Sequence, residues 1–356
     1  MNFTRIRAIA ARKFASLRRD KRTFGFIVVM PAIQIVLMGI AIGQTPTGLD
    51  IAVIDDGPAG MGATITDHLV NSESLVVHTS YGSVAKAREG IEAGEIWAAL
   101  HIAPNGTLEM HLDNTNQQVT NTIMLEVRNA MTAALEAQGD ARPLVMAQPV
   151  YGERDPAFID FLAPGIMVMV CFMFSLILTM MAFVGERYDG TLDRVFAAGT
   201  QPVEVLLGHL AAFSTVLVGQ VTVVILIATY GFGIPINGSL PLLFLLALLL
   251  GWSAMCFGLF VSTKARSEFQ AMQLGMPVMF PVLLLSGIMW PVQALPGWVQ
   301  PISWVLPSTW TAEAFRSIMI RGWGLEHSDV ATAFAFDLLF ALLALGVAAR
   351  TLKVRD

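Results

Sequence analysis

Charged residues are scarce in this chain of 356 residues, of which 14% are Asp, Glu, Lys or Arg and 55% are hydrophobic. Soluble globular proteins carry roughly a quarter charged residues, so the composition argues against that class. Six apolar segments are long enough to cross a hydrocarbon core, which needs about 20 residues each. The composition therefore predicts a mainly α-helical, polytopic membrane protein with six spans. The predicted spans are Phe24–Gly43, Phe161–Val184, Val205–Phe232, Leu240–Ser262, Met272–Trp290 and Val330–Ala349.

The chain also lacks the residue patterns of several enzyme classes. Its two cysteines, Cys171 and Cys256, both fall in predicted spans and indicate neither a disulfide framework nor a metal site. No Gly-Lys pair occurs, which excludes a Gly-x-x-x-x-Gly-Lys-Ser/Thr phosphate-binding loop, and no His-Glu-x-x-His is present. We therefore expect no catalytic site, no cofactor, no metal and no nucleic-acid partner, and no ATP hydrolysis by the chain itself.

The charges that are present sort by region. Residues 1–22 hold eight Lys/Arg against one acid, whereas residues 44–157 carry fifteen acids and five bases. Short basic flanks of membrane spans stay cytoplasmic. This rule predicts that both termini are cytoplasmic, that residues 23–43 form the first span and that residues 44–157 form an extracytoplasmic domain. Bases after the fourth and sixth spans agree with this orientation: Lys264, Arg266, Arg350, Lys353 and Arg355.

The basic start of the chain has a helical pattern. Apolar residues recur at steps of three and four, with bases largely on the opposite side, which predicts an amphipathic helix in the membrane interface over residues 1–22. Two alternatives remain open, a cleaved signal peptide, whose apolar core is usually about 7 to 15 residues, and a basic tail that only orients the first span. The apolar face is expected to comprise Phe3, Ile6, Ala10, Phe14 and Leu17.

The predicted outer domain alternates between strand-like and helix-like segments, which indicates a small α/β domain. No nucleophile and base are readable in it. Ligand binding, a gate, a cap over an exit and a docking surface all remain open as its role. The strand-like segments are 49–56, 75–80, 96–103 and 108–113, and the helix-like segments are 61–70, 83–94 and 119–138.

Few polar residues fall within the remaining part, the transmembrane domain 158–356. Asp337 in the last span is either a functional group at membrane depth or a carboxylate near the outer interface with access to water. Methionines form faces on two spans, and flexible thioethers suit a surface for varied apolar ligands, although methionine also fills packing gaps. These substrate-path candidates are Met169, Met173 and Met180 of the second span and Met272, Met276 and Met279 of the fifth.

The segment 291–326 contains four prolines, and five of the seven tryptophans lie between Trp290 and Trp323. It is too broken for a continuous span, so short re-entrant or interfacial helices at the outer surface are expected. Within it, Glu313 and Arg316 have the three-residue spacing of a helical ion pair.

The loop 185–204 between the second and third spans is polar and regular. Gly190 is expected to end the incoming helix, a short helix is expected over Leu192–Ala198 with Gly199 closing it, and Pro202 suits the start of the next helix.

This loop, the basic amphipathic start and the Pro/Trp segment together resemble the type-2 class of ATP-binding-cassette (ABC) exporter permeases. The residues that carry the likeness in the loop are Glu186, Gly190-Thr191-Leu192-Asp193-Arg194 and Glu204-Val205-Leu206-Leu207-Gly208. Residues 94–104, 162–168 and 286–322 are similar to other family segments, so the likeness covers nearly the whole chain. Gly199 replaces a usual proline and His209 a usual lysine, which affects the second half of the loop.

The resemblance implies a prokaryotic cytoplasmic (inner) membrane permease that pairs with a second permease subunit, as a homodimer or heterodimer. It also implies two copies of a cytoplasmic ABC ATPase subunit. Membrane lipid is expected as a further partner, because the amphipathic pattern of residues 1–22 predicts a helix in the membrane interface. Spans two and five would line the path of a drug, an antibiotic, a lipid or a polysaccharide. The implied ATPase-coupling residues are Glu186, Arg187, Asp189, Gly190, Thr191, Leu192, Asp193 and Arg194.

The sequence thus favours the permease subunit of an ABC exporter that moves a hydrophobic or amphipathic substrate outward. The alternative is an extracytoplasmic ligand sensor or membrane scaffold without transport.

Overall fold

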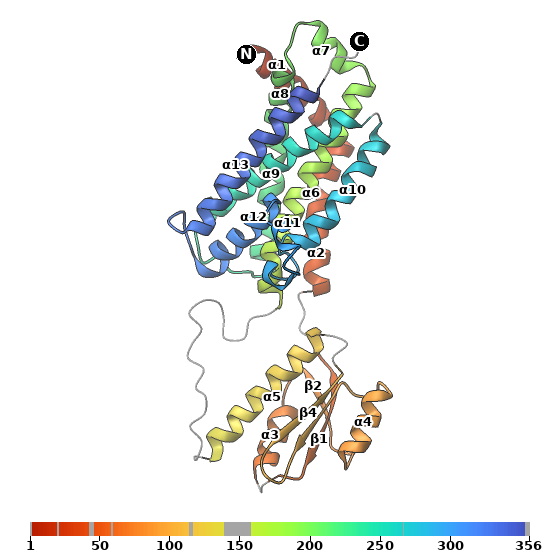
Figure 1. The fold of residues 1–356 in the computed structure, drawn as a ribbon, viewed down its shortest axis with the longest axis vertical. Coiled ribbons are helices and arrows are strands. Elements are labelled where there is room, and N and C mark those ends of the chain that lie inside the picture. The colour runs from red at the N-terminus through yellow and green to blue at the C-terminus, as the bar shows by residue number, and fades with distance from the viewer. Residues whose placement is uncertain are drawn as a thin grey trace. The chain divides into compact units, whose positions relative to one another are not determined.

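The computed structural model divides the chain into two compact units, Met1–Gly43 with Val150–Asp356, and Gln44–Pro149. We call them the helical unit and the α/β unit (Figure 1). The residues that the structure describes are 2–19, 21–42, 46–57, 60–113, 117–138, 158–265 and 267–352.

The helical unit contains the predicted spans. Five helices among the described residues are long and apolar enough to cross a membrane, and each corresponds to one predicted span, although α10 ends at Leu285 and so stops short of the predicted end at Trp290. They are α6 (Phe158–Tyr188), α8 (Pro202–Leu226) continued by η1 (Ile227–Gly231), α9 (Leu240–Lys264), α10 (Glu268–Leu285) and α13 (Ser328–Thr351). The first predicted span falls on α2 (Lys21–Ile42), whose apolar stretch by the same criterion is Val29–Met38, so a sixth span stays a prediction.

Two of these helices form the centre of the unit. α6 packs against α9, α10 and α2, and α9 also packs against α13 and α8. Close approach is possible because a small residue lies at the crossing: a Cβ atom at Gly258 of α9 would lie 2.7 Å from the carbonyl oxygen of Leu176 in α6. α10 and α13 lie at the periphery, and only 17% and 22% of the residues in their apolar windows are buried.

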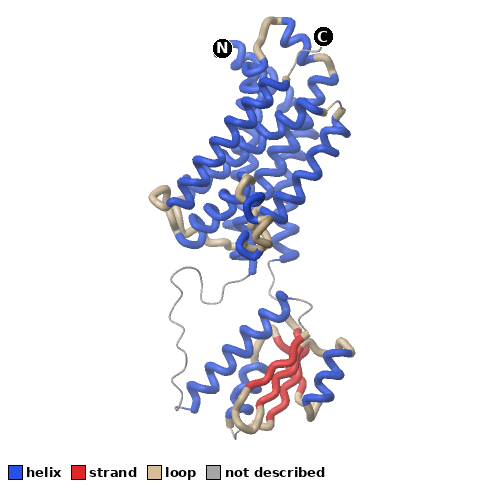
Figure 2. The backbone as a smooth tube through the Cα atoms, viewed as in Figure 1, coloured by secondary structure: helices blue, strands red, loops and turns tan. Residues whose placement is uncertain are grey.

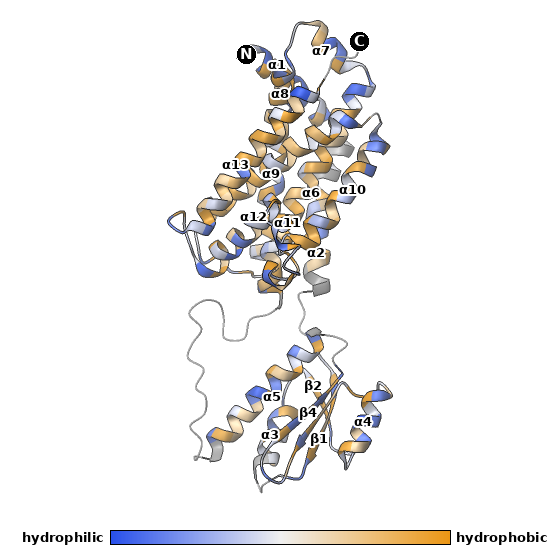
Figure 3. Ribbon diagram, viewed as in Figure 1, coloured by the Kyte–Doolittle hydropathy of each residue, from blue (hydrophilic) through white to orange (hydrophobic). Residues whose placement is uncertain are grey.

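The two ends of the helical unit differ. At one end lie α1 (Phe3–Arg19) and α7 (Thr191–Ala197), together with the end of α13, and we call this the α7 end (Figure 1). Hydrophilic residues gather there, whereas the middle of α9 and α13 is hydrophobic (Figure 3).

The opposite end, the α12 end, holds the segment rich in proline and tryptophan. As the prolines predict, it forms short helices in place of a continuous span: η2 (Val292–Ala294), α11 (Gln300–Ser303), α12 (Pro307–Arg316) and η3 (Ser317–Arg321). The predicted ion pair between Glu313 and Arg316 is confirmed, with an oxygen-to-nitrogen distance of 3.8 Å.

Arg316 also joins three segments of the α12 end. Its side chain is largely buried and donates hydrogen bonds to the carbonyl oxygens of Phe161, Gly287 and Ile288. Its guanidinium lies 4.3 Å from the ring centre of Phe161, at the start of α6.

The α/β unit contains one four-stranded sheet in the order β2-β1-β3-β4. Its strands are drawn in red in Figure 2. β1 pairs in parallel with β2 and β3, and β4 is antiparallel to β3. Apolar side chains of alternate strand positions pack with α3 and α5 on one face, and a smaller cluster including Ala87 of α4 covers the other. The bounds are β1 Leu49–Asp55, α3 Met61–Val70, β2 Leu75–His78, α4 Val84–Glu92, β3 Ala98–Ile102, β4 Leu108–Leu112 and α5 Gln117–Gln138, close to the predicted segments.

The crossing of α1 over α8 depends on Gly208. A Cβ atom there would lie 2.6 Å from Cγ2 of Ile9 and 3.2 Å from the carbonyl oxygen of Ile6. Gly208→Val is therefore expected to displace α1 and to destabilise the helical unit by about 1–3 kcal/mol, the usual cost of overpacking. Thermal unfolding of the purified protein, and the rate of tryptic cleavage within α1, would measure this.

Gly219→Val provides the matched control on the same helix, because a Cβ atom at Gly219 meets nothing within 4 Å. Equal tryptic cleavage rates for the two variants would contradict the close packing of α1 on α8.

Candidate functional site

The segment between α6 and α8 consists of the short helix α7 with a glycine of positive φ on each side. α6 ends at Tyr188, Gly190 has φ 66°, α7 follows, and Gly199 has φ 77°. Both glycines lie in the left-handed region that other residues rarely adopt, so they end α6 and α7 at fixed places. The structure thus confirms the predicted short helix, which begins one residue earlier and ends one residue earlier than expected.

α7 is anchored on its inner side. Leu192 and Phe196 are buried in a cluster with Leu206 of α8 and Ala348 and Leu352 at the end of α13. The side chains at Asp193 and Arg194, by contrast, are exposed. A short helix with two buried apolar anchors is a rigid projection from the α7 end.

The N-terminal helix is fastened to the same turn. Glu204, in the first turn of α8, is buried, and its carboxylate accepts hydrogen bonds from the backbone N–H groups of Gln201 at 3.1 Å and of Asn2. Arg5 of α1 donates to the carbonyl oxygen of Gly199 and lies 3.7 Å from Glu204. The start of α1 is therefore tied to the end of α7 and the start of α8.

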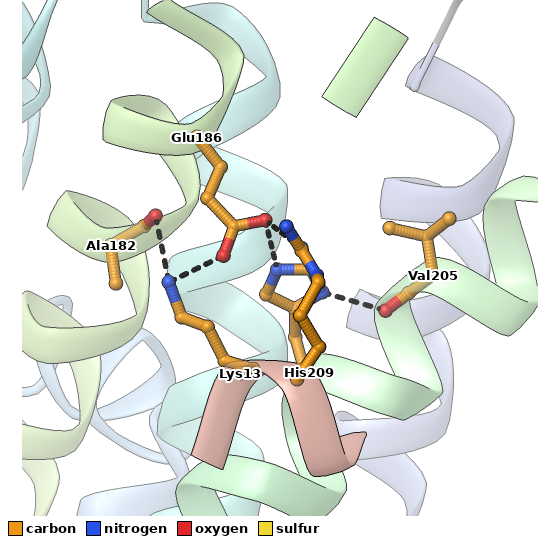
Figure 4. Close-up of polar contacts among 6 residues, drawn as sticks. Lys13, Ala182, Glu186, Val205 and His209 are labelled. Atoms are coloured by element: carbon orange, nitrogen blue, oxygen red, sulfur yellow. Dashed lines mark hydrogen bonds and ion pairs between the residues drawn. The ribbon is translucent and has the colours of Figure 1, made fainter. Parts of the chain in front are cut away.

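A second group of charges ties the middle of α1 to α6 and α8, and we call Arg12, Lys13, Glu186 and His209 the Glu186 clasp (Figure 4). Oε1 of Glu186 lies 2.6 Å from Nζ of Lys13. Oε2 lies 2.7 Å from Nη2 of Arg12 and 3.1 Å from Nε2 of His209. The carboxylate from α6 is thus held by two cations of α1 and one imidazole of α8.

Three of the four clasp side chains are largely shielded from water: those of Lys13 and His209 are 8% and 0% exposed, and that of Glu186 is 13% exposed. The fourth, Arg12, is 42% exposed and covers the carboxylate from the surface side. Nδ1 of His209 lies 2.8 Å from the carbonyl oxygen of Val205, so both ring nitrogens face an oxygen and the imidazolium form would donate to both. Removing one member of such a group leaves a buried charge without its partner.

The structure divides the residues predicted to couple to an ATPase. Glu186 points inward, and Arg187 donates to the carbonyl oxygen of Thr263 in α9 at 3.1 Å. Leu192 is a buried anchor, and Gly190 and Thr191 form the corner and first residue of α7. The exposed members are Asp189, Asp193 and Arg194.

Sequence reasoning missed several residues of this end. Tyr188, which is 79% exposed, precedes Asp189 in the sequence and belongs to the solvent-facing side of the α7 end. Lys13 and His209 are buried. Lys13 lies four residues from the buried Ile9 and Leu17 of α1, so the helical period places it on the buried face. The sequence alone still predicts an exposed side chain, because lysine is rarely buried unless it is paired with an acid.

The predicted apolar face of α1 is partly wrong. Ile6 and Leu17 are buried as expected, but Phe3 and Phe14 are exposed, with exposed fractions of 79% and 41%. The buried stripe runs Ile6, Ile9, Lys13 and Leu17, because α1 packs along α8 with its charged clasp inward.

The candidate substrate-path methionines fall into two sets. Met169, Met173 and Met180 of α6 are buried, and Met180 lies against Gly275 of α10. Met272 and Met276 of α10 are exposed, and Met279 is partly buried. Of the six candidates, only those of α10 therefore offer thioethers to a second molecule.

Asp337 of α13 is fully buried, which contradicts the alternative that it has access to water. Oδ2 accepts a hydrogen bond from the hydroxyl of Thr311 in α12 at 2.8 Å. Its other oxygen has no hydrogen-bond partner among the described residues. The pair joins α12 to α13 at the edge of the α12 end.

Glu186→Ala is expected to destabilise the helical unit by about 3–5 kcal/mol, the range measured when one partner of a buried ion pair is removed. Glu186→Gln keeps the shape and one acceptor oxygen, so it should destabilise less. Thermal unfolding in detergent would rank the variants. Asp189→Ala serves as the control, because it removes an exposed carboxylate three residues away. Equal unfolding temperatures for Glu186→Ala and Asp189→Ala would show that the clasp contributes nothing.

The sequence of the whole chain is similar to known transporter proteins. The family model described as ABC-2 family transporter protein matches residues 21–350. The chain is 33% identical to ABC transporter G family member 20 of Dictyostelium discoideum over 372 residues, which cover 98% of this chain and 50% of that protein. It thus spans about half the length of this relative and of ABC transporter G family member 23.

Shorter relatives are matched over most of their length. The chain is 22% identical to the probable multidrug ABC transporter permease YbhR of Escherichia coli, over 91% of this chain and 92% of that protein. It is 26% identical to the inner membrane transport permease YhhJ, over 67% of this chain and 68% of that protein. With a family model matched over nearly its whole length, the chain belongs to the ABC-2 family of transporter proteins.

Proposed function

We propose that the chain is the transmembrane permease subunit of an ABC exporter, powered by a separate ATPase subunit that docks on the exposed side of α7. The observation that carries the proposal is the rigid α7 projection together with the Glu186 clasp behind it. The end-to-end match to a probable multidrug ABC permease supports the assignment.

The docking surface would comprise Tyr188, Asp189, Asp193 and Arg194. All four are exposed, and they lie on or beside a helix whose other side is buried. Exposed charges of both signs and an aromatic ring suit a specific protein partner, because charge pairing sets orientation and aromatic residues supply contact area.

A force on α7 would pass directly to the spans. α7 is separated from α6 and from α8 by only a few residues, with glycine corners that fix the turn. The clasp and the Glu204 contacts join α1 to the same helices. The ATPase would therefore move α1, α6, α7 and α8 at this end as one body.

The orientation rests on charge. The α7 end carries the basic helix α1 and the exposed Lys264 and Arg350, and basic flanks stay cytoplasmic. We therefore place the α7 end and both termini in the cytoplasm, with α2 as the first of six spans and the α/β unit outside. By this placement the protein is a multi-pass protein of a prokaryotic cytoplasmic membrane.

The exposed face of α10 would meet a second permease subunit and the substrate. It presents Phe269, Met272, Met276 and Phe280, all with exposed fractions above 40%. An apolar face with flexible thioethers suits a hydrophobic or amphipathic substrate such as a drug, an antibiotic or a lipid. A second copy or a sister permease would complete the path.

Exchange of the two charges on α7 tests the docking surface. Asp193→Arg combined with Arg194→Asp keeps the net charge but reverses its pattern, and like charges facing each other across an interface cost several kcal/mol. We expect at least a roughly tenfold loss of ATPase retained on the purified permease, since each ~1.4 kcal/mol is a factor of ten. Transport should fall in parallel, and the unfolding temperature should not change.

Glu326→Lys is the control, because Glu326 is an exposed charge at the α12 end. The proposal fails if the permease never associates with an ATPase encoded beside it, or if the α7 exchange and the control behave alike.

A further inference from the structure

The helical unit has an apolar groove between α9 and α13, with a volume of about 380 Å³. Phe257 and Phe260 line it from α9, Val305 lines it from the α12 end, and a stripe from Phe336 to Val347 lines it from α13. Every lining side chain is apolar. No residue of α6 or α10, the helices of the substrate-path candidates, lines the groove.

The length of the groove corresponds to one leaflet of a bilayer. The stripe on α13 covers eleven steps of about 1.5 Å, or about 16 Å. Half of a ~30 Å hydrocarbon core is about 15 Å. The stripe ends near the α7 end of α13, so a chain lying in it would belong to the leaflet on that side.

Two cations continue the groove by one turn. Lys264 follows Phe260 by four residues and Phe257 by seven, and Arg350 follows Val347 by three and Leu343 by seven. These spacings keep each cation on the lining face of its own helix. Both side chains are exposed, and neither forms an ion pair with an acid among the described residues.

The helix ends that carry these cations are held together. The hydroxyl groups of Thr263 and Thr351, each next to one of the cations in sequence, lie 3.0 Å apart. Arg187 of α6 donates to the carbonyl oxygen of Thr263 and lies close to the same point. Lys264, Arg350 and Arg187 therefore place positive charge about one helical turn beyond the apolar groove.

We propose that this groove binds an anionic phospholipid, with one acyl chain along α13 and the phosphate between Lys264 and Arg350. A basic side chain attracts anionic headgroups at the surface while its alkyl part lies along the chain. A second copy of the protein fits less well, because a two-fold interface at this groove would bring the same cations of both copies to the same depth. The site is separate from α7 and does not depend on ATPase docking.

The experiment uses the full chain in nanodiscs of phosphatidylcholine that contain a phosphatidylglycerol analogue with a photoreactive group on its acyl chain. Peptides from α9 and α13 should be labelled. Leu343→Trp, which fills the groove, should lower this labelling at least about fivefold, whereas Leu342→Trp should not. Leu342 is the matched control, because it is equally exposed on the same helix but does not line the groove.

The headgroup is tested separately. Lys264→Gln with Arg350→Gln should lower labelling by the phosphatidylglycerol probe by roughly 25-fold, since each basic residue at an anionic surface contributes about a factor of five. Labelling by the matching phosphatidylcholine probe should stay unchanged. Arg7→Gln with Arg19→Gln removes the same charge from exposed positions of α1 and should leave both signals unchanged.

Three results would overturn the proposal: equal labelling of Leu343→Trp and the wild type, equal labelling by the two probes, or a disulfide between two Leu343→Cys copies, which would make the groove a protein interface. Loss of ATPase binding in the α7 exchange variant would not alter any of these signals, so the two proposals fail independently.

Discussion

Glu186 is a carboxylate from α6 that is almost enclosed by protein, and the geometry of the α7 end follows from the groups that neutralise it. Arg12 and Lys13 reach it from α1 and His209 reaches it from α8. A buried charge without a partner is costly, so the three helices are held in contact wherever this carboxylate is ionised. The position of the short helix α7 is fixed as a result, because short turns connect it to α6 and α8, two of the three helices that the clasp joins.

At the other end of α6, the buried side chain of Arg316 likewise joins neighbouring segments. Arg316 binds the carbonyl oxygens of Phe161, Gly287 and Ile288, which belong to the start of α6 and to the segment after α10. α6 is thus held by an acid at the α7 end and by an arginine at the α12 end, and along its length it packs on α9. A central helix fixed at both ends transmits a displacement better than a helix that is held by apolar contacts alone, since charged hydrogen bonds are directional.

The peripheral helices have the opposite character. α10 and α13 leave apolar faces exposed, and such faces in a membrane protein must be covered by lipid or by another subunit. The thioethers of α10 suit apolar ligands of varied shape. The groove between α9 and α13 is lined by apolar side chains, with Lys264 and Arg350 one turn beyond it, and suits a lipid with a negative headgroup. One rigid centre therefore presents two apolar surfaces with different chemistry.

Local hydropathy, helical period and turn residues predicted five of the long apolar helices, the short helix between two glycines, the breaks at the prolines and the strands of the α/β unit. These local patterns did not predict which charges face inward. Glu186 reads as an exposed loop residue and Lys13 as a solvated base, and only the packing of α1 on α6 and α8 shows that they neutralise each other. Likewise Phe3 and Phe14 are exposed because Ile9 and Lys13 take the buried positions. Periodicity specifies that a helix has two faces, but the neighbouring helices decide which face is buried.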